Sequence, residues 1–337
     1  LGFDPHRTHT AANALVDVSL ARRVPATSAY QVHDLTYSYA RSLGGPDPVP
    51  AVAEFARLHA HDNAVLAADL DNLLGAAAAA AESDPEAFMS IVQTLAGVGY
   101  HDSHRPTHGL LRLIEVAVER VRPEPGRCHT LLTKLGNAYY NEGDCTAATR
   151  VYEEALALAP SQSRRAVLLS LLGKVRAESG DHSAARADFD RAYAVADATG
   201  DPEVRMRVLE QHSVAAFRRR DYGTVRDVAR EGLGLSQELG LRFQEAIFLN
   251  NLGTAEFELG VCAAVELHTR AQAIAVELGN DNLLALTHRT LGADRQAQED
   301  HERAGVHFGH ARRLYGSLGQ RERKRKLEHL MRQIGYW

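Results

Sequence analysis

Three histidines lie close together in one short stretch of the chain, and imidazole groups can bind metal ions or transfer protons. They are His101, His104 and His108. Three histidines on one face of a helix could bind zinc, but Pro106 falls between the second and the third and interrupts the helical spacing. No cysteine lies nearby to complete a zinc site. The sequence therefore favours an exposed turn here over a metal centre.

Sequence motifs of the common enzyme classes do not occur in the chain. The nucleophile pattern GxSxG, the zinc pattern HExxH and the phosphate-binding loop GxxxxGK[ST] are all missing. The nearest approach to a phosphate-binding loop is Leu172-Gly173-Lys174, which is followed by Val175 instead of Ser or Thr. We therefore expect no catalytic residue, no bound metal and no cofactor on these residues.

A fixed period of about forty residues governs the second half of the chain. Closely similar phrases end at Gly200, Gly240, Gly279 and Gly319, which are 40, 39 and 40 residues apart. Such a period is typical of helical repeats, in which each unit buries its apolar face against its neighbours. Arrays of this kind present extended binding surfaces, so the period indicates a protein that binds another molecule.

A second series of residues recurs in phase with these glycines. Each copy carries a Leu-Gly pair or its equivalent, then a small residue, then a larger or ring-bearing residue in most copies, and then another small residue. The first copy has the fullest series, which reads Leu135-Gly136, Tyr139, Ala148, Tyr152, Ala155 and Pro160. In the third copy His212-Ser213 replaces the Leu-Gly pair, and in the fourth His268 stands at the place of the ring.

This series resembles the tetratricopeptide repeat, with five copies over 127–320. Small residues let two antiparallel helices approach closely, and the aromatic residue fills the space where the next repeat lands. We read each copy as helix, short turn and helix, with Gly or a polar residue after the first helix and Asp before the second. The resemblance implies an all-α fold, a right-handed superhelix or α-solenoid, preceded by a partial winged-helix piece.

The first 44 residues do not follow the repeat. Their pattern predicts a helix over 10–20, a hairpin over 20–32 with its turn at 25–28, and a further helix that begins at His33. Helix, hairpin and helix in this order form the closing half of a winged helix.

The phrase Val32-His33-Asp34 resembles the Met-His-Asp motif of STAND-class signal-transducing NTPases, the relatives of NB-ARC and NLR proteins. In that family the motif follows the wing, and its histidine contacts the β-phosphate of bound ADP in the closed, inactive state. The resemblance implies this nucleotide-sensing role for His33 in an intact protein that binds ADP or ATP with Mg²⁺ through a domain upstream of Leu1. Within this chain alone, a histidine without a ligand at the start of a helix is the other interpretation.

The sequence divides into four parts. Residues 1–44 are read as the partial winged-helix domain, 45–126 as linking helices with degenerate repeat-like pairs, 127–320 as the five repeats and 321–337 as a capping helix. The last part opens with a basic run, which we read as a solvated helix face because the whole chain carries a net charge of −5. Direct binding of nucleic acid is therefore not expected.

In tetratricopeptide arrays the first helix of each pair lines the concave groove, so the resemblance also implies where a ligand would bind. Polar and aromatic residues on these helices that the packing series does not use are the candidates for the ligand groove: Asn137, Tyr140, Lys174, Phe217, Asn250, Asn251, Phe257, Arg289 and Gln296. Asn side chains donate and accept hydrogen bonds at once, which suits contact with a peptide backbone. Packing between repeats is the alternative for Phe217 and Phe257, and a surface position for Asn251.

The STAND resemblance implies a sensor module. A protein or peptide effector would bind the groove, release the autoinhibited ADP-bound state and permit oligomerisation on activation. The repeat domain of a large transcriptional regulator and a free-standing peptide-binding scaffold are the alternatives. The sequence identifies neither the effector nor the output, which could be cell death, defence or transcription.

Composition points to a cytoplasmic protein. The three cysteines, Cys128, Cys145 and Cys262, form no CxxC pair and read as free thiols in a reducing compartment. No apolar stretch is long enough to span a bilayer, and no signal peptide opens the sequence.

Overall fold

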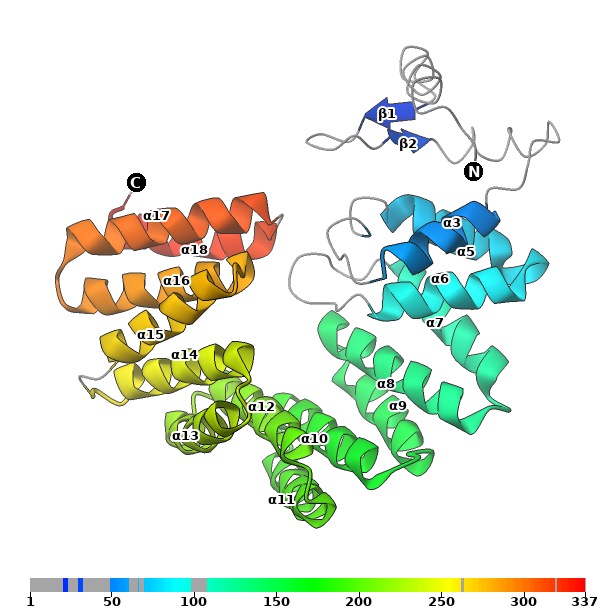
Figure 1. Ribbon diagram of the computed structural model, residues 1–337, viewed down its shortest axis with the longest axis horizontal. Helices are drawn as coiled ribbons and strands as arrows, with labels where there is room; N and C mark the ends of the chain where they lie inside the picture. Colours follow the sequence, from blue (N-terminus) through cyan, green and yellow to red (C-terminus); the bar gives the residue numbers. More distant parts are fainter. Residues whose placement is uncertain are drawn as a thin grey trace. The chain divides into compact units, whose positions relative to one another are not determined.

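Turn residues at regular intervals divide the chain into short α-helices. The computed structural model describes residues 21–23, 30–32, 49–60, 66, 70–97, 108–261, 264–318 and 320–336. These residues form fifteen helices and one two-stranded sheet (Figure 1). The chain folds as two units, Leu1–Glu142 and Gly143–Trp337.

The first unit begins with the hairpin that the sequence predicts. Strand β1 (Ala21–Arg23) pairs antiparallel with β2 (Tyr30–Val32), with Ala21 opposite Val32. His33 and the two helices predicted on either side of the hairpin lie outside the described residues. The winged-helix interpretation and the role of His33 therefore stay predictions.

Five helices complete the first unit: α3 (Val49–Leu58), α5 (Leu70–Ser83), α6 (Pro85–Gly97), α7 (His108–Val121) and α8 (Pro125–Glu142). The side chain of Asp84 caps α6 by accepting a hydrogen bond from the Ala87 N–H at 3.0 Å. Helix α6 buries Phe88 and Ile91 completely, and it packs against α3, α5 and α7. Of the clustered histidines, His101 and His104 lie outside the described residues, and His108 opens α7.

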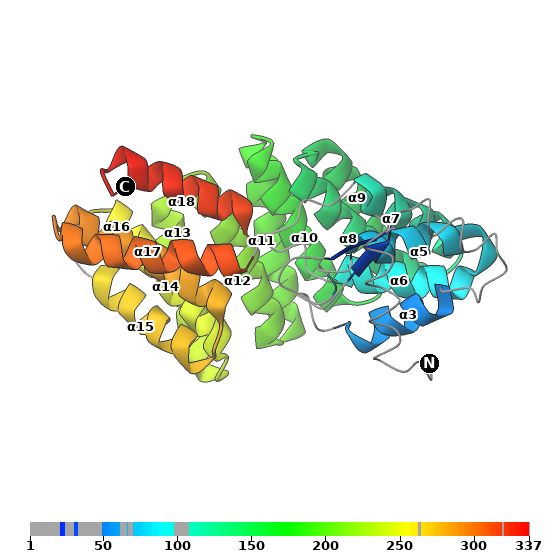
Figure 2. The ribbon, with the colours of Figure 1, turned by 90° about the horizontal axis from the view of Figure 1, so that it is seen from above.

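The described residues of the second unit form ten helices in sequence: α9 (Cys145–Ala157), α10 (Gln162–Glu178), α11 (His182–Thr199), α12 (Pro202–Arg218), α13 (Tyr222–Glu238), α14 (Arg242–Glu258), α15 (Ala264–Glu277), α16 (Asp281–Ala297), α17 (His301–Ser317) and α18 (Arg321–Gln333). Each helix packs against the next one in the chain, and α18 lies beside α17 (Figure 2). The predicted fold, an α-solenoid of helical pairs, is confirmed.

The Leu-Gly signal has a direct steric cause in this unit. A Cβ atom at Gly173 would lie 3.0 Å from the Phe189 ring, and one at Gly292 would lie 2.6 Å from the Phe308 ring. Glycine is therefore required where the ring of the second helix packs on the first. In the third copy both partners change, because Ser213 stands for the glycine and Ala229 for the ring. The small side chain of Ala229 leaves room for the side chain of Ser213.

The turn inside each pair follows one design. Gly143, Gly180 and Gly260 adopt the left-handed conformation, with φ of +86°, +89° and +77°. Arg220 and Glu299 occupy the same place in the third and fifth copies, with φ of +56° and +60°, although left-handed backbone is costly for residues with a side chain. The turn position thus keeps its geometry even where glycine is absent.

Aspartate at the start of the second helix completes the turn. Asp144, Asp181, Asp221 and Asp300 each accept a hydrogen bond from the backbone N–H three residues later, at 2.9 to 3.2 Å. The predicted N-caps are confirmed at these four positions. In the described part of the chain neither Cys128 nor Cys145 is part of a disulfide.

Candidate functional site

The first helices of successive pairs in the second unit, α10, α12 and α14, carry a row of corresponding residues. Because residues three, four, seven or eight apart share one face of a helix, each helix presents several of them together. We call this row the first-helix surface, and it consists of Lys174, Glu178, Val214, Phe217, Arg218, Asn251, Thr254 and Phe257.

Two hydrogen bonds connect residues of this row to the neighbouring helical pair. The Arg218 guanidinium on α12 donates to Glu178 on α10 at 2.8 Å. The Asn251 amide on α14 donates to the Ser213 hydroxyl on α12 at 3.1 Å. The Arg218–Glu178 ion pair therefore links the row from α10 to α12, whereas Asn251 contacts Ser213, which is buried and lies outside the row.

An exposed apolar pair lies in the middle of the row. Val214 is 42% exposed and Phe217 is 37% exposed, one turn apart on α12. Phe217 contacts the Tyr222 ring edge-on, with ring centroids 6.1 Å apart. Large apolar side chains left in water on a helix whose other faces are packed are typical of a contact surface. Phe257, forty residues later on α14, is half-buried.

Charge lies beside this apolar pair. Lys174 is only 9% exposed, and burial, with a smaller effect from the positive charge of Arg218, lowers the pKa of Lys174 to about 8. The carboxylate of Glu178 acts in the opposite direction. Lys174 was predicted to line the groove, but like Asn250 it is buried, and the anion that acts on it is Glu178 of its own helix.

Asn250 was expected to line the groove, but the structure places it in the interior. Its side chain is 3% exposed, and its Oδ1 accepts a hydrogen bond from the Thr290 hydroxyl at 3.0 Å. The amide lies in the interior between α14 and α16 because Thr290 supplies a polar partner there. The neighbouring Asn251 is half-buried and remains on the first-helix surface.

The other predicted groove residues are half-buried and lie elsewhere. Asn137 and Tyr140 belong to α8 of the first unit. Arg289 on α16 hydrogen-bonds the Tyr315 hydroxyl of α17, and burial nevertheless raises the pKa of Tyr315. Gln296 accepts hydrogen bonds from the hydroxyl of Tyr336 and from His301 Nδ1. Arg289 and Gln296 therefore join α16 to the end of the chain.

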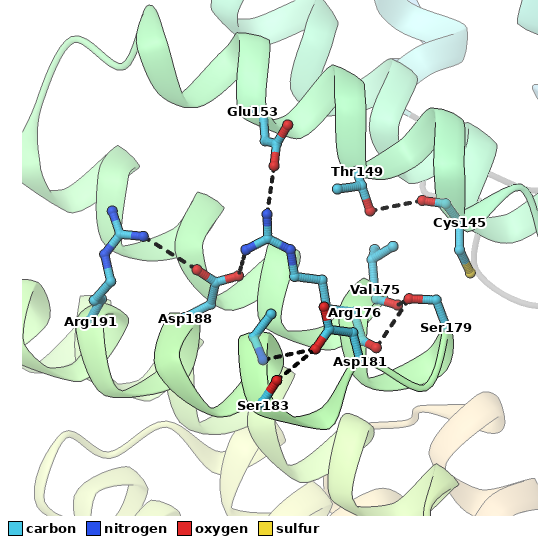
Figure 3. Close-up of polar contacts among 11 residues, drawn as sticks. Cys145, Thr149, Glu153, Val175, Arg176, Ser179, Asp181, Ser183, Asp188 and Arg191 are labelled. Carbon is cyan, nitrogen blue, oxygen red and sulfur yellow. Dashed lines mark hydrogen bonds and ion pairs between the residues drawn. The ribbon is translucent and has the colours of Figure 1, made fainter.

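Sequence reasoning missed an ion network around Arg176, at the place where the first copy has Tyr139. Figure 3 shows its guanidinium between Glu153 of α9 and Asp188 of α11, at 2.5 Å from each. Asp188 is 2% exposed, and burial raises the pKa of its carboxyl although Arg176 and Arg191 oppose this. The signal available in the sequence was an arginine at the position where the first copy has Tyr139. The network holds three helices together.

A polar network also replaces an apolar contact in the fourth copy. His268 Nδ1 lies 2.6 Å from Asp294 Oδ2, and both side chains are almost fully buried. Its Nε2 lies 3.2 Å from the Asn250 carbonyl oxygen and 3.3 Å from Thr254 Oγ1. The row of Thr254, His268 and Asp294 has the order of a catalytic triad, but the Thr254 hydroxyl donates to its own helix, to the Asn250 carbonyl at 2.9 Å. The arrangement therefore serves packing between repeats.

The comparisons with known proteins agree with this architecture. Residues 127–198, which hold the first two copies, match the family model of the tetratricopeptide repeat. The repeat type that the sequence resembles is thereby confirmed for these copies. No curated protein matches the chain.

Several solved structures share the fold. BtubC (BKLC) from P. vanneervenii has 22% identity and a TM-score of 0.53, over 62% of this chain and 90% of its own. A Rap protein complexed with competence and sporulation factor has 10% identity and a TM-score of 0.56, over 86% of this chain and 88% of its own.

A third similar structure is a STAND protein with a tetratricopeptide repeat sensor from Pyrococcus horikoshii. It has 14% identity and a TM-score of 0.56, over 93% of this chain. The chain spans about half of that protein's length, 46%. At these identities the likeness concerns the fold.

None of the described helices combines the length and the apolar character that crossing a membrane requires.

Proposed function

We propose that the second unit binds a protein or peptide effector along the first-helix surface. The observation that carries this proposal is the exposed pair of Val214 and Phe217 on α12, next to Arg218 and its ion pair with Glu178 of α10. Fully burying a valine or phenylalanine side chain is worth about 1.5–3 kcal/mol, and part of that gain is still available at both residues. An apolar anchor with a charged rim is the usual composition of a binding hot spot.

The side chains of the first-helix surface indicate what kind of effector would bind. An extended segment would place an apolar side chain over Val214 and Phe217. The half-buried amide of Asn251 would contact the segment's backbone, since an amide both donates and accepts. The solved Rap protein, whose fold is similar, is complexed with competence and sporulation factor, which supports an effector that binds to the helical repeats.

Selection of peptides against the full chain tests this proposal. Peptides from a random display library that bind the wild type are measured against Phe217→Glu and against Val276→Glu, a matched control. Val276 is a 63% exposed residue on α15, outside the first-helix surface. We expect Phe217→Glu to weaken the selected peptides by tenfold or more, about 1.4 kcal/mol, and Val276→Glu to leave them unchanged. Equal binding to both variants would place the site elsewhere.

We further propose that the chain is the sensor part of a STAND-class signalling protein. The hairpin at β1 and β2, the phrase Val32-His33-Asp34 after it and the fold shared with a STAND sensor support this interpretation. Effector binding would then release an ADP-bound closed state and allow oligomerisation, provided the effector binds the open state more tightly. A cytoplasmic location accords with this role.

Nucleotide content separates this finer proposal from its alternatives, a transcriptional regulator's repeat domain and a free-standing scaffold. The intact polypeptide is purified and denatured, and released nucleotide is identified by chromatography. We expect ADP in the wild type and less of it in His33→Ala. An intact polypeptide that releases no adenine nucleotide would remove the STAND interpretation and leave the peptide-binding proposal standing.

A further inference from the structure

A pocket of about 730 Å³ lies between the second and third copies of the repeat, within the second unit. It opens where α10 and α12 end and α11 and α13 begin. Its volume falls in the range of sites for small molecules, about 300–1,000 Å³. The first-helix surface uses other residues of α12, so the pocket is a separate feature.

The pocket coincides with the place where the third copy departs from the repeat. Ala216 follows His212 by four residues, as Tyr139 follows Leu135 in the first copy. The second copy has Arg176 at this position and uses it in the ion network (Figure 3). The third copy has only a methyl group there, and Ala216 lines the pocket. Loss of a large side chain at one repeat position therefore opens the space.

The inner wall of the pocket is apolar and aromatic. Phe189 and His212 are stacked, with ring centroids 4.2 Å apart and ring planes at 23°. His212 Nδ1 is hydrogen-bonded to the Tyr193 hydroxyl at 2.9 Å, so Nε2 is the ring nitrogen left for a ligand. Burial lowers the pKa of His212, which favours the neutral form of its ring. Four alanines complete the wall: Ala177, Ala185, Ala215 and Ala216.

The rim of the pocket carries charges of both signs. The guanidinium groups of Arg186 and Arg219 and the carboxylate of Asp190 belong to exposed side chains. Asp221 also lines the pocket, but it caps α13 through the Thr224 N–H at 3.2 Å and the Thr224 hydroxyl at 2.9 Å. Arg186, Arg219 and Asp190 are therefore the charged groups that a ligand can pair with, and His182 and Ser183 also line the pocket.

We propose that this pocket binds a small zwitterionic molecule with aromatic side chains, of about the size of a dipeptide. Its aromatic part lies against Phe189, His212 and the alanines. Its carboxylate pairs with Arg186 and Arg219, because guanidinium groups bind carboxylates with paired hydrogen bonds. Its ammonium group lies toward Asp190.

Calorimetric titration of the full chain with three probes tests this assignment. The probes are the dipeptide Phe-Phe, its C-terminal amide and its N-acetyl form. We expect Phe-Phe to bind and the amide to bind about tenfold to a hundredfold more weakly, since a hydrogen bond to a charged group is lost. The N-acetyl form should lose less, because Asp190 is exposed to solvent.

Two sets of variants locate the binding. Ala216→Tyr restores the side chain of the first copy and fills the pocket, so it should abolish binding of Phe-Phe. Arg186→Ala with Arg219→Ala should bind Phe-Phe no better than its amide. Arg165→Ala, an exposed arginine of α10 outside the pocket, should behave as the wild type. Circular dichroism establishes that each variant is folded, and the double arginine variant decides the outcome if Ala216→Tyr is not.

Absence of heat from all three probes at millimolar concentration would overturn the proposal. Undiminished binding of Phe-Phe to the folded Ala216→Tyr variant, or to the double arginine variant, would overturn it as well. Phe217→Glu should leave Phe-Phe binding unchanged, which separates this pocket from the peptide-binding surface proposed above.

Discussion

The second and fourth copies of the repeat fill the same place with different chemistry. In the second copy the Phe189 ring packs over Gly173, and in the fourth the His268 ring packs over Gly253. Both rings are buried. The two rings have similar shapes, but the histidine brings two nitrogens into the interior, and a buried polar group is costly unless it is hydrogen-bonded.

The fourth copy satisfies these nitrogens with partners from the helices on either side. Asp294 of α16 pairs with Nδ1, and the carbonyl oxygen of Asn250 on α14 accepts from Nε2. The third copy, which follows Phe189, has Ala215 at the position that corresponds to Asp294. The repeat therefore fixes the volume of the side chain that packs over the glycine. Whether that side chain is polar depends on a matching residue in the following pair.

Removal of Asp294 should have the largest effect, because it leaves His268 buried without its partner. We expect Asp294→Ala to lower the free energy of unfolding by about 3–5 kcal/mol. The measurement is denaturant-induced unfolding followed by circular dichroism.

The double variant His268→Phe with Asp294→Leu provides the control, since it replaces the polar pair by apolar groups. It should lose less than half of what Asp294→Ala loses. A single variant as stable as the double variant would show that the pair is not a coupled unit.

The glycines beneath the rings should come next. A Cβ at Gly253 would lie 2.7 Å from the His268 ring, and one at Gly292 would lie 2.6 Å from Phe308. We expect Gly253→Ala and Gly292→Ala to cost about 1–3 kcal/mol each through overpacking.

Gly234 is the matched control for these two glycines. It is a helical glycine with nothing within 4 Å of its Cβ position, and alanine there should stabilise the helix by up to about 1 kcal/mol. Thermal unfolding measures all three variants. Equal changes at the three positions would mean that the ring contacts do not require glycine.

Acid should act on the fifth copy through a histidine cluster between α16 and α17. His288 Nδ1 lies 2.9 Å from His307 Nδ1, and its ring stacks on His310 at 4.8 Å. Burial, with His307, His310 and Arg313, lowers the pKa of His288 to about 4. The unfolded chain takes up this proton near pH 6.5, so the folded state loses stability as the pH falls from about 6.5 to 4.

Since His288 is half-buried, we expect an acid loss of about 1–2 kcal/mol after solvent screening. Unfolding of the wild type and of His288→Gln at pH 7 and pH 5 measures it. The difference between the two pH values should be smaller in the variant, and an identical difference in both proteins would contradict the assignment.

The left-handed turn residues should give the smallest effect, and with the opposite sign. Arg220→Gly and Glu299→Gly place glycine where Gly180 stands in the second copy. Each should raise the free energy of unfolding by about 1 kcal/mol or less, because glycine adopts positive φ without steric cost. Gly180→Ala should lower it by a similar amount. Destabilisation by both glycine substitutions would indicate that the side chains contribute more than the backbone strain costs.

Much of the repeat architecture could be read from the sequence because steric rules fix it. The turn after each first helix demands positive φ, and the ring of each second helix demands a small partner, so both leave marks at fixed spacing. Gly180, Asp181 and the Gly173–Phe189 contact follow from these rules. The antiparallel pairing of β1 with β2 was also predictable, because two short strand-like segments flank a Pro-containing stretch, whose predicted turn lies outside the described residues.

The polar interior was less predictable, because it depends on pairs from different repeats. Asn250 was expected to contact a ligand, and no local pattern indicated that Thr290, forty residues later, would receive it in the interior. The ion pair of Arg176 with Asp188 and the pocket beside Ala216 also depend on residues from different helices, so no local pattern indicated them. Phe217 was identified correctly as a first-helix residue, but its exposure beside Val214 depends on how α12 packs.

Photo-crosslinking tests directly whether the first-helix surface of the second unit binds a protein or peptide. Benzoylphenylalanine replaces Phe217 in one variant and Val276 in the other, and each is irradiated with a peptide selected on the wild-type chain. We expect a crosslinked product at position 217 and none at position 276. Crosslinking at position 276 with none at position 217 would contradict it.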